Sequence, residues 1–190
     1  MSMPMQNRQY KYADYSKWAE GERVELIDGH VYAMTPAPSR IHQEILGNLY
    51  NEFANYLRGK RCRPYIAPFD VRLPKGNELD EEIDTVVQPD LSIVCDPEKL
   101  DDKGCKGAPD LIAEIISPSS LKLDTTAKKA LYEQVGVKQY WIVYPHEKIV
   151  MVYTLKEERQ YDDGEAFSQG DLIPVIVLEN LTVSLERVFS

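Results

Sequence analysis

The sequence contains no apolar run that approaches the roughly 20 residues needed to cross a bilayer. Its first residues also lack the apolar stretch of a secretory signal peptide. We therefore expect a cytoplasmic protein without a membrane segment. Cysteine is scarce as well, and none of the three residues, Cys62, Cys95 and Cys105, belongs to a Cys-x-x-Cys pair. This pattern argues against a disulfide framework and a four-cysteine zinc site, so we expect reduced thiols that pack as small apolar side chains.

The chain also lacks the motifs of several large enzyme classes. It has no His-x-His or His-Glu-x-x-His spacing, which argues against a zinc hydrolase. No Gly-x-x-x-x-Gly-Lys-Ser/Thr loop and no Gly-x-Gly-x-x-Gly is present, which argues against the common nucleotide-binding folds. The absence of a Gly-x-Ser-x-Gly elbow weakens a serine hydrolase interpretation.

Basic residues are outnumbered, because 31 Asp and Glu residues against 22 Lys and Arg residues give a net charge of -9. Such a surface does not suit a protein that coats nucleic acid through bulk electrostatics. It is compatible with an enzyme in which a bound divalent cation and a local basic patch reverse the field at one site.

The 190 residues are enough for one domain with its own core. Residues 1–12 are polar and Met-rich, so we expect a flexible N-terminal arm followed by a single domain over 13–190. Periodicity and turn residues predict the elements inside this domain. They are a hairpin over 22–34 around Asp28-Gly29, a helix over about 40–58, strands over about 62–73, an acidic solvated loop over 76–85, strands over 91–95 and 111–117, a helix over 122–135, a strand over 139–144 and a strand-rich tail over 148–190. This order predicts an α/β (α+β) sandwich in which helices flank a central mixed sheet, with additional β-hairpins at the N- and C-terminal ends.

Two carboxylates lie in unusual surroundings. Asp90 immediately precedes the apolar run "LSIVC", and Glu114 lies inside the apolar run "LIAEIIS". A buried charge is costly unless it is paired or bound to a metal. Two carboxylates at the mouth of adjacent strands form an oxygen-rich site of the kind that Mg²⁺ prefers. The alternative is a Glu neutralised by Arg or Lys, together with an Asp that caps a turn.

A lysine on the helix over 122–135 is predicted to face the same region. At about 100° per residue, Lys128 and Asp124 fall on or beside the apolar stripe of this helix, whereas Lys129 faces solvent. An inward lysine can hold an attacking water or stabilise negative charge on a phosphate. In the alternative interpretation, its amine simply pairs with Asp124.

Two residues of the first helix are accessory candidates. His42 falls on the inward stripe of the helix over 40–58, and Glu44 falls on its polar side. A lone inward histidine is more often a hydrogen-bonded core residue than a catalyst, but it can reach a site at the end of the helix. Glu44 is the weaker candidate of the two.

Four segments together resemble the Uma-type family of restriction endonuclease-like proteins, long catalogued as a domain of unknown function. They are "YAMTPAPSRIHQEILGNL", "QPDLSIVCDPEKL", "GAPDLIAEIISPSS" and "DTTAKKALYEQVGVKQYWIVYP". The resemblance extends from about Tyr15 to Thr154, and the last two segments are specific in combination. It implies the PD-(D/E)XK nuclease fold, whose core of a helix, three strands, a helix and a strand agrees with the elements expected above.

The resemblance also implies roles for particular residues. Asp90 matches the PD aspartate, Glu114 matches the acidic residue of (D/E)XK, and the backbone carbonyl of Ile115 is the expected third metal contact. The superfamily lysine would stand at position 116, which is Ile116 here. The family instead places a lysine on the following helix, and this residue is Lys128. His42 matches a histidine typical of the first helix of the family.

These observations predict a Mg²⁺- or Mn²⁺-dependent endonuclease that hydrolyses phosphodiester bonds of DNA. The catalytic residues would be Asp90, Glu114 and Lys128, and the accessory residues His42, Asp124 and Glu44. A homodimer would match the symmetry of duplex DNA. The alternative is a non-catalytic module that retains the nuclease fold and binds nucleic acid or protein, which the acidic composition favours.

Overall fold

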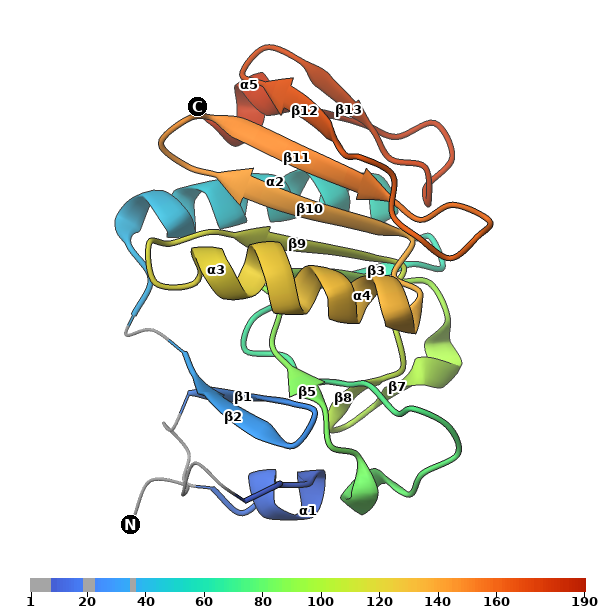
Figure 1. Ribbon diagram of the computed structural model, residues 1–190. Coiled ribbons are helices and arrows are strands. Elements are labelled where there is room, and N and C mark those ends of the chain that lie inside the picture. Colours follow the sequence, from blue (N-terminus) through green and yellow to red (C-terminus); the bar gives the residue numbers. More distant parts are fainter. Residues whose placement is uncertain (1–7, 19–22, 35–36) are drawn as a thin grey trace.

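The computed structural model describes residues 8–18, 23–34 and 37–190, and the statements below refer to these residues (Figure 1). The central sheet has six strands in the order β12-β11-β10-β9-β6-β3. β9 and β10 are parallel, whereas the other neighbouring pairs are antiparallel, so the sheet is mixed as predicted. The strands are β3 (Arg63–Ile66), β6 (Leu91–Val94), β9 (Leu111–Ile115), β10 (Gln139–Tyr144), β11 (Ile149–Thr154) and β12 (Glu165–Ser168).

Helices cover both faces of the central sheet, as Figure 1 shows. α2 (Arg40–Leu57) packs a buried stripe that includes Leu49 and Phe53 against one face. The other face carries a continuous helical segment made of α3 (Leu121–Leu123), the π-helical turn η3 (Asp124–Lys128) and α4 (Lys129–Val135). The helices predicted over 40–58 and 122–135 are confirmed, and so is the sandwich in which helices flank a mixed sheet.

A second six-stranded sheet, in the order β2-β1-β5-β4-β8-β7, lies beyond α4 from the central sheet. Its strands are β1 (Val24–Ile27), β2 (His30–Ala33), β4 (Val71–Arg72), β5 (Val86–Val87), β7 (Leu100–Asp101) and β8 (Gly104–Lys106). β1 and β2 form the predicted hairpin, and both Asp28 and Gly29 have the positive φ that a tight hairpin turn requires. Because Leu131 and Tyr132 belong to the same core as Val71 and Val87, α4 is enclosed between two layers.

The C-terminal region adds a small hairpin and a helix to the central layer. β13 (Leu172–Pro174) pairs with β14 (Thr182–Ser184), and α5 (Leu185–Val188) follows. Ile173, Val183 and Val188 are part of the same core as α2. Three short helical turns, α1 (Tyr12–Tyr15), η1 (Asp80–Glu82) and η2 (Pro97–Lys99), complete the described elements. Among the described residues, no helix has both the length and the apolar character that a bilayer crossing demands.

Two expectations about polar segments are wrong in part. Residues 1–7 of the expected arm lie outside the described residues, but Tyr10 and Tyr12 are buried and share a core with Leu26. Their aromatic rings supply apolar area that covers the hairpin, so the loose segment does not extend through residues 10–12. The acidic segment 76–85 is not fully solvated either. It contains η1, and Asp80 is bound at 2.6 Å by the buried Arg72.

The expectation of three reduced thiols is also wrong, because Cys62 and Cys95 form a disulfide. The two cysteines are 33 residues apart in sequence, but they flank antiparallel strands in which Arg63 is opposite Val94. Strand pairing therefore brings them face to face, which their spacing in sequence does not reveal. Cys105 is free and buried, as predicted.

Candidate active site

Asp90 and Glu114 come from adjacent strands of the central sheet. Asp90 directly precedes β6, and Glu114 lies near the end of β9. These strands are antiparallel, with Leu91 opposite Ala113, so the start of one lies beside the end of the other. The backbone N–H of Asp90 donates to Glu114 Oε2 at 3.2 Å. The structure therefore brings together the two carboxylates that the sequence analysis paired.

The Asp90 carboxylate is held through one of its oxygens. Its Oδ2 accepts hydrogen bonds from the backbone N–H of Ile115 at 2.8 Å and contacts His42 Nε2 at 3.1 Å. No hydrogen bond to Oδ1 is found in the described part of the chain, and the side chain is 20% exposed. One oxygen thus fixes the orientation of Asp90, while the other is available to a ligand in the cleft.

Glu114 is deeply buried and lies on the face of β9 that points toward α4. Its Oε1 accepts hydrogen bonds from Lys128 Nζ and from the Tyr132 hydroxyl, both at 2.9 Å. Burial raises the pKa of Glu114 well above its usual range. Lys128 opposes this effect, and the neighbouring carboxylates, among them Asp124, add to it. The site therefore holds Glu114 in an environment that favours a positive partner.

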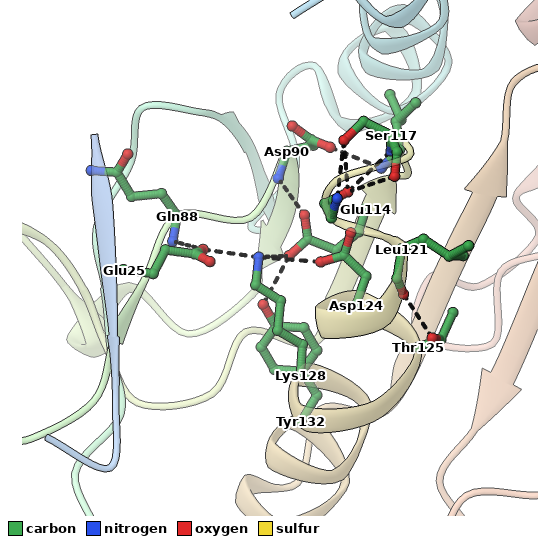
Figure 2. Close-up of polar contacts among 12 residues, drawn as sticks. Glu25, Gln88, Asp90, Glu114, Ser117, Leu121, Asp124, Thr125, Lys128 and Tyr132 are labelled. Carbon is green, nitrogen blue, oxygen red and sulfur yellow. Dashed lines mark hydrogen bonds and ion pairs between the residues drawn. The ribbon is translucent and has the colours of Figure 1, made fainter. Parts of the chain in front are cut away.

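Lys128 points inward, as the helical periodicity predicted, and only 5% of its side chain is exposed. Its amine lies 2.9 Å from Glu114 Oε1, 2.9 Å from Glu25 Oε1 and 3.5 Å from Asp124 Oδ1 (Figure 2). Burial alone would lower the pKa of Lys128, but the three carboxylates together raise it well above its usual range. The amine is thus an ammonium at neutral pH. It is a hydrogen-bond donor and a positive charge, and it is not a proton acceptor.

A widened helical turn presents this lysine. The segment Asp124–Lys128 is π-helical, and its threonines satisfy carbonyls that regular α-helical bonding would occupy. Thr125 Oγ1 donates to the carbonyl of Leu121 at 2.7 Å, and Tyr140 Oη donates to the carbonyl of Asp124 at 3.0 Å. The turn also changes which residues face inward. Lys129, expected to face solvent, is partly buried, with its amine 3.8 Å from the centroid of the Tyr153 ring.

Two residues of the cluster were missed by the sequence analysis. Glu25 is buried on β1 and approaches Lys128 from the second sheet. It stands beside the apolar pair Leu26-Ile27, which is the same signal that singled out Glu114, a charge inside an apolar strand. Tyr132 was treated only as part of a motif. Its position four residues after Lys128 places it on the same side of the helix.

The accessory candidates of α2 behave differently from each other. His42 points into the site, where its Nε2 contacts Asp90, and its backbone N–H donates to the N-cap residue Ser39 at 3.2 Å. Glu44 is exposed and binds Arg40 of its own helix, with 2.5 Å between Arg40 Nη1 and Glu44 Oε1. The structure therefore brings His42 into the cluster and leaves Glu44 outside it, as the polar side of the helix dictates.

A cleft of about 600 Å³ contains these groups. It is lined by the end of β9, the start of α2, the loop after β9 and the turn after β10. The polar and charged side chains along it are those of Arg23, Glu25, Ser39, His42, Gln43, Gln88, Asp90, Glu114, Ser117, Ser119, Ser120, Asp124, Lys128 and His146. Four carboxylates, those of Glu25, Asp90, Glu114 and Asp124, thus share a cleft with a single lysine.

The chemistry of part of the donor set is compatible with a hard divalent cation. Asp124 Oδ1 is buried and has no hydrogen-bond partner among the described residues. Burial raises the pKa of Asp124 despite the nearby Lys128. No group of three or more His, Cys, Asp or Glu side chains in the described segments is already arranged to hold a metal. Asp90 and Glu114 remain as a two-carboxylate set, and Mg²⁺ commonly uses one or two carboxylates and completes its shell with water.

Comparison with known proteins agrees with this fold. The chain matches the model of the Uma2 family, described as "Putative restriction endonuclease", over residues 12–186. The chain belongs to the Uma2 family. The family resemblance drawn from the motifs around Asp90, Glu114 and Lys128 is thereby confirmed. This Uma2 protein thus belongs to a family described as "Putative restriction endonuclease".

This Uma2 protein is similar in sequence to a cyanobacterial protein and similar in fold to a solved structure. The uncharacterized protein slr1290 of Synechocystis sp. is 31% identical over 132 residues, which are 68% of this chain and 65% of the relative. The chain therefore spans slightly less than two thirds of that relative. The crystal structure of "a putative nuclease belonging to DUF820" from Anabaena variabilis has a TM-score of 0.73 at 21% identity, over 93% of this chain and 96% of that one. At this level of identity, the likeness concerns the fold.

Proposed function

We propose that this Uma2 protein is a Mg²⁺- or Mn²⁺-dependent endonuclease that hydrolyses phosphodiester bonds of DNA. One observation carries the proposal: Asp90, Glu114 and Lys128 come from three different elements and converge in one cleft. The family match supports a nuclease, because the Uma2 family is described as "Putative restriction endonuclease". The domain that carries this activity is taken to be residues 13–190.

Asp90, Glu114 and the backbone carbonyl of Ile115 would hold the metal ion. Asp90 has an oxygen without a hydrogen bond to the described residues, and an all-oxygen set suits Mg²⁺ and Mn²⁺. When bound, the ion would activate a water and neutralise charge on the phosphate. His42 and the Ile115 N–H would keep the Asp90 carboxylate in one orientation.

Lys128 would act as a donor beside the metal ligands. Its raised pKa keeps it positively charged, so it would hold the attacking water or stabilise negative charge that develops on the phosphate. Burial strengthens such an electrostatic contribution, since little water is available to screen it. In the (D/E)XK pattern the lysine comes from the same strand as the acidic residue. Here a lysine from the following helix would supply the charge.

The experiment is a cleavage assay of supercoiled plasmid with the purified full chain. We expect nicked or linear DNA with Mg²⁺ or Mn²⁺, and intact plasmid in EDTA. Asp90→Ala should lower the rate by more than about 100-fold, because even partners of metal ligands are typically worth 10- to 100-fold. Glu186→Gln on α5 is a matched control for the loss of one exposed negative charge. Cleavage that persists at the same rate in Asp90→Ala would contradict the proposed site.

The second candidate function is a non-catalytic module that binds nucleic acid or protein. The net charge of -9 favours the protein-binding form of this module, because phosphate binding usually needs a basic surface. A titration with Mn²⁺, in which calorimetry measures metal binding, distinguishes the two functions. Metal binding that is lost in Asp90→Ala, with no cleavage of plasmid, linear or single-stranded DNA or of RNA, would establish the module and refute the nuclease.

Two further expectations are part of the proposal. A homodimer would match the two-fold symmetry of duplex DNA, and sedimentation of the full chain tests it. A cytoplasmic location is tested together with the Cys62–Cys95 disulfide, since such bonds are uncommon in reducing compartments. If the protein resides in a reducing cytoplasm, Cys62 and Cys95 would be free thiols. Alkylation during cell lysis would then modify both cysteines.

A further inference from the structure

Glu25 is a buried carboxylate that neither the sequence motifs nor the proposed metal site explains. It lies on β1, beside the apolar residues Leu26 and Ile27, and only 2% of it is exposed. Burying a carboxylate is costly unless donors compensate for its lost hydration. The donors that surround Glu25 therefore indicate what it does.

Two donors hold one oxygen of this carboxylate. Glu25 Oε1 accepts a hydrogen bond from Gln88 N at 2.8 Å and lies 2.9 Å from Lys128 Nζ. The Gln88 side chain is fixed in turn, because its Nε2 donates to Tyr15 Oη at 3.1 Å and to Asp70 Oδ1 at 2.8 Å. Glu25 thus presents a fixed negative charge to the lysine.

The Lys128 ammonium lies between carboxylates that belong to different layers. Figure 2 shows Gln88 and Glu25 on one side of the amine, and Glu114 and Asp124 on the other. The distances from Nζ to Glu25 Oε1 and to Glu114 Oε1 are both 2.9 Å. A lysine side chain has a flexible four-carbon stem, so attachment from two sides restricts where the amine can be. Without Glu25, all remaining contacts would draw the amine toward one side.

We propose that Glu25 is a positioning residue that holds the Lys128 ammonium beside Glu114, and so sets where the amine meets a bound phosphodiester. This inference rests on the nuclease function proposed above. It makes the β1–β2 hairpin of the second sheet a part of the active site. If the pair were only structural, its loss would lower stability and leave the turnover of the folded enzyme unchanged.

A double-mutant cycle of Glu25→Gln and Lys128→Met tests the proposal, with Glu186→Gln as the control for loss of one negative charge. Glutamine keeps an oxygen that can accept the hydrogen bond from Gln88 N, so we expect this variant to fold. We expect Glu25→Gln to lower kcat by at least about tenfold and to leave KM within about twofold. In the Lys128→Met background it should cause less than about a twofold further loss, because Glu25 acts through the lysine.

Either of two kinetic results overturns the proposal. One is a kcat of Glu25→Gln that equals the kcat of the wild type and of Glu186→Gln. The other is a tenfold loss that recurs in the Lys128→Met background, since Glu25 would then act independently of the lysine. If Lys128→Met does not fold, Glu25→Gln and Glu25→Ala decide the question, and both must lower kcat without a matching change in KM.

Urea unfolding of the same proteins tests the pairing without any substrate. Each variant changes the unfolding equilibrium constant by some factor relative to the wild type. We expect the factor for the double variant to differ by about fivefold or more from the product of the factors for the two single variants. Agreement with that product within about twofold overturns the pairing. The two residues could prove to be coupled although the wild type cleaves no nucleic acid. In that case the contact between Glu25 and Lys128 would stand, and only the nuclease function would be refuted.

Discussion

Two buried cations of this protein, Arg72 and Lys128, are each surrounded by carboxylates, but the balance of charge around them is opposite. We call the first group the Arg72 cluster and the second the Lys128 cluster. The Arg72 cluster contains Arg72, Lys103, Lys106, Asp80 and Asp101, and the Lys128 cluster contains Lys128, Glu25, Glu114 and Asp124. The first has three cations for two carboxylates, whereas the second has one cation for three carboxylates.

The carboxylates of the two clusters also differ in the direction in which their pKa values are shifted. Asp80 and Asp101 are 23% and 46% exposed, and both lie 2.6 Å from Arg72 nitrogens. Their pKa values are lowered, although burial opposes the shift, because hydrogen bonds from Lys106 and Arg72 favour the charged form. In the Lys128 cluster, burial raises the pKa values of Glu114 and Asp124. A cluster whose carboxylates are all paired with cations has a structural role, whereas a cluster with an excess of carboxylates beside a cleft is suited to bind a cation.

The strongest challenge to this comparison is Arg72→Met. Because it leaves Asp80 and Asp101 without their buried partner, we expect the free energy of unfolding to fall by about 3 kcal/mol. Cleavage per folded molecule should be unchanged, because Arg72 does not line the cleft. Urea unfolding and the plasmid assay measure the two quantities. A loss of cleavage without a loss of stability would show that the Arg72 cluster is functional and would erase the contrast.

A smaller effect is expected for Tyr132→Phe, which changes a hydrogen-bond donor to the Lys128 cluster. This change removes the hydrogen bond from the tyrosine hydroxyl to Glu114 Oε1 without opening a large cavity. We expect a loss of about 1.5 kcal/mol in unfolding free energy, as is typical of hydrogen bonds to charged groups. Equilibrium unfolding in EDTA measures it. An unchanged stability would indicate that Glu114 does not depend on this donor.

Asp124→Asn should act in the opposite direction. Burial raises the pKa of Asp124 in the folded state, so its contribution to stability is complete below its unfolded pKa and is lost as the pH rises through the folded pKa. Asparagine does not ionise, so at pH 7 the variant should be more stable by about 1 kcal/mol. The gain should vanish near pH 3. Urea midpoints measured at both pH values in EDTA decide this, and a destabilised variant at pH 7 would mean that the Lys128 contact dominates.

The smallest effect is expected for Glu44→Gln, which provides an exposed reference for both clusters. Glu44 and Arg40 form an i,i+4 pair on the surface of α2. We expect a change of less than about 0.5 kcal/mol in unfolding free energy, because exposed pairs are screened by water. Cleavage should remain within about twofold of the wild type. A larger loss of cleavage would restore Glu44 to the accessory role that its sequence position suggested.

The elements and much of the cluster were predictable because they depend on local patterns. The apolar run around Glu114 indicated a buried carboxylate, and helical periodicity predicted that Lys128 and His42 point inward. Contacts between distant segments were not predictable in the same way. Glu25 reaches Lys128 only because the second sheet encloses α4, and Cys62 meets Cys95 only through the register of β3 and β6. Local chemistry was thus readable from the sequence, whereas long-range neighbours required the fold.

The π-helical turn at Asp124–Lys128 makes the length of this segment critical. A π-turn accommodates one residue more than the regular helix, and Thr125 and Thr126 satisfy the carbonyls that it frees. Without the widened turn, the extra residue would rotate the residues on either side of it by about 100° relative to each other. The turn therefore absorbs this residue. It keeps Asp124 at its start and Tyr132 beyond its end on the buried side of one helical segment.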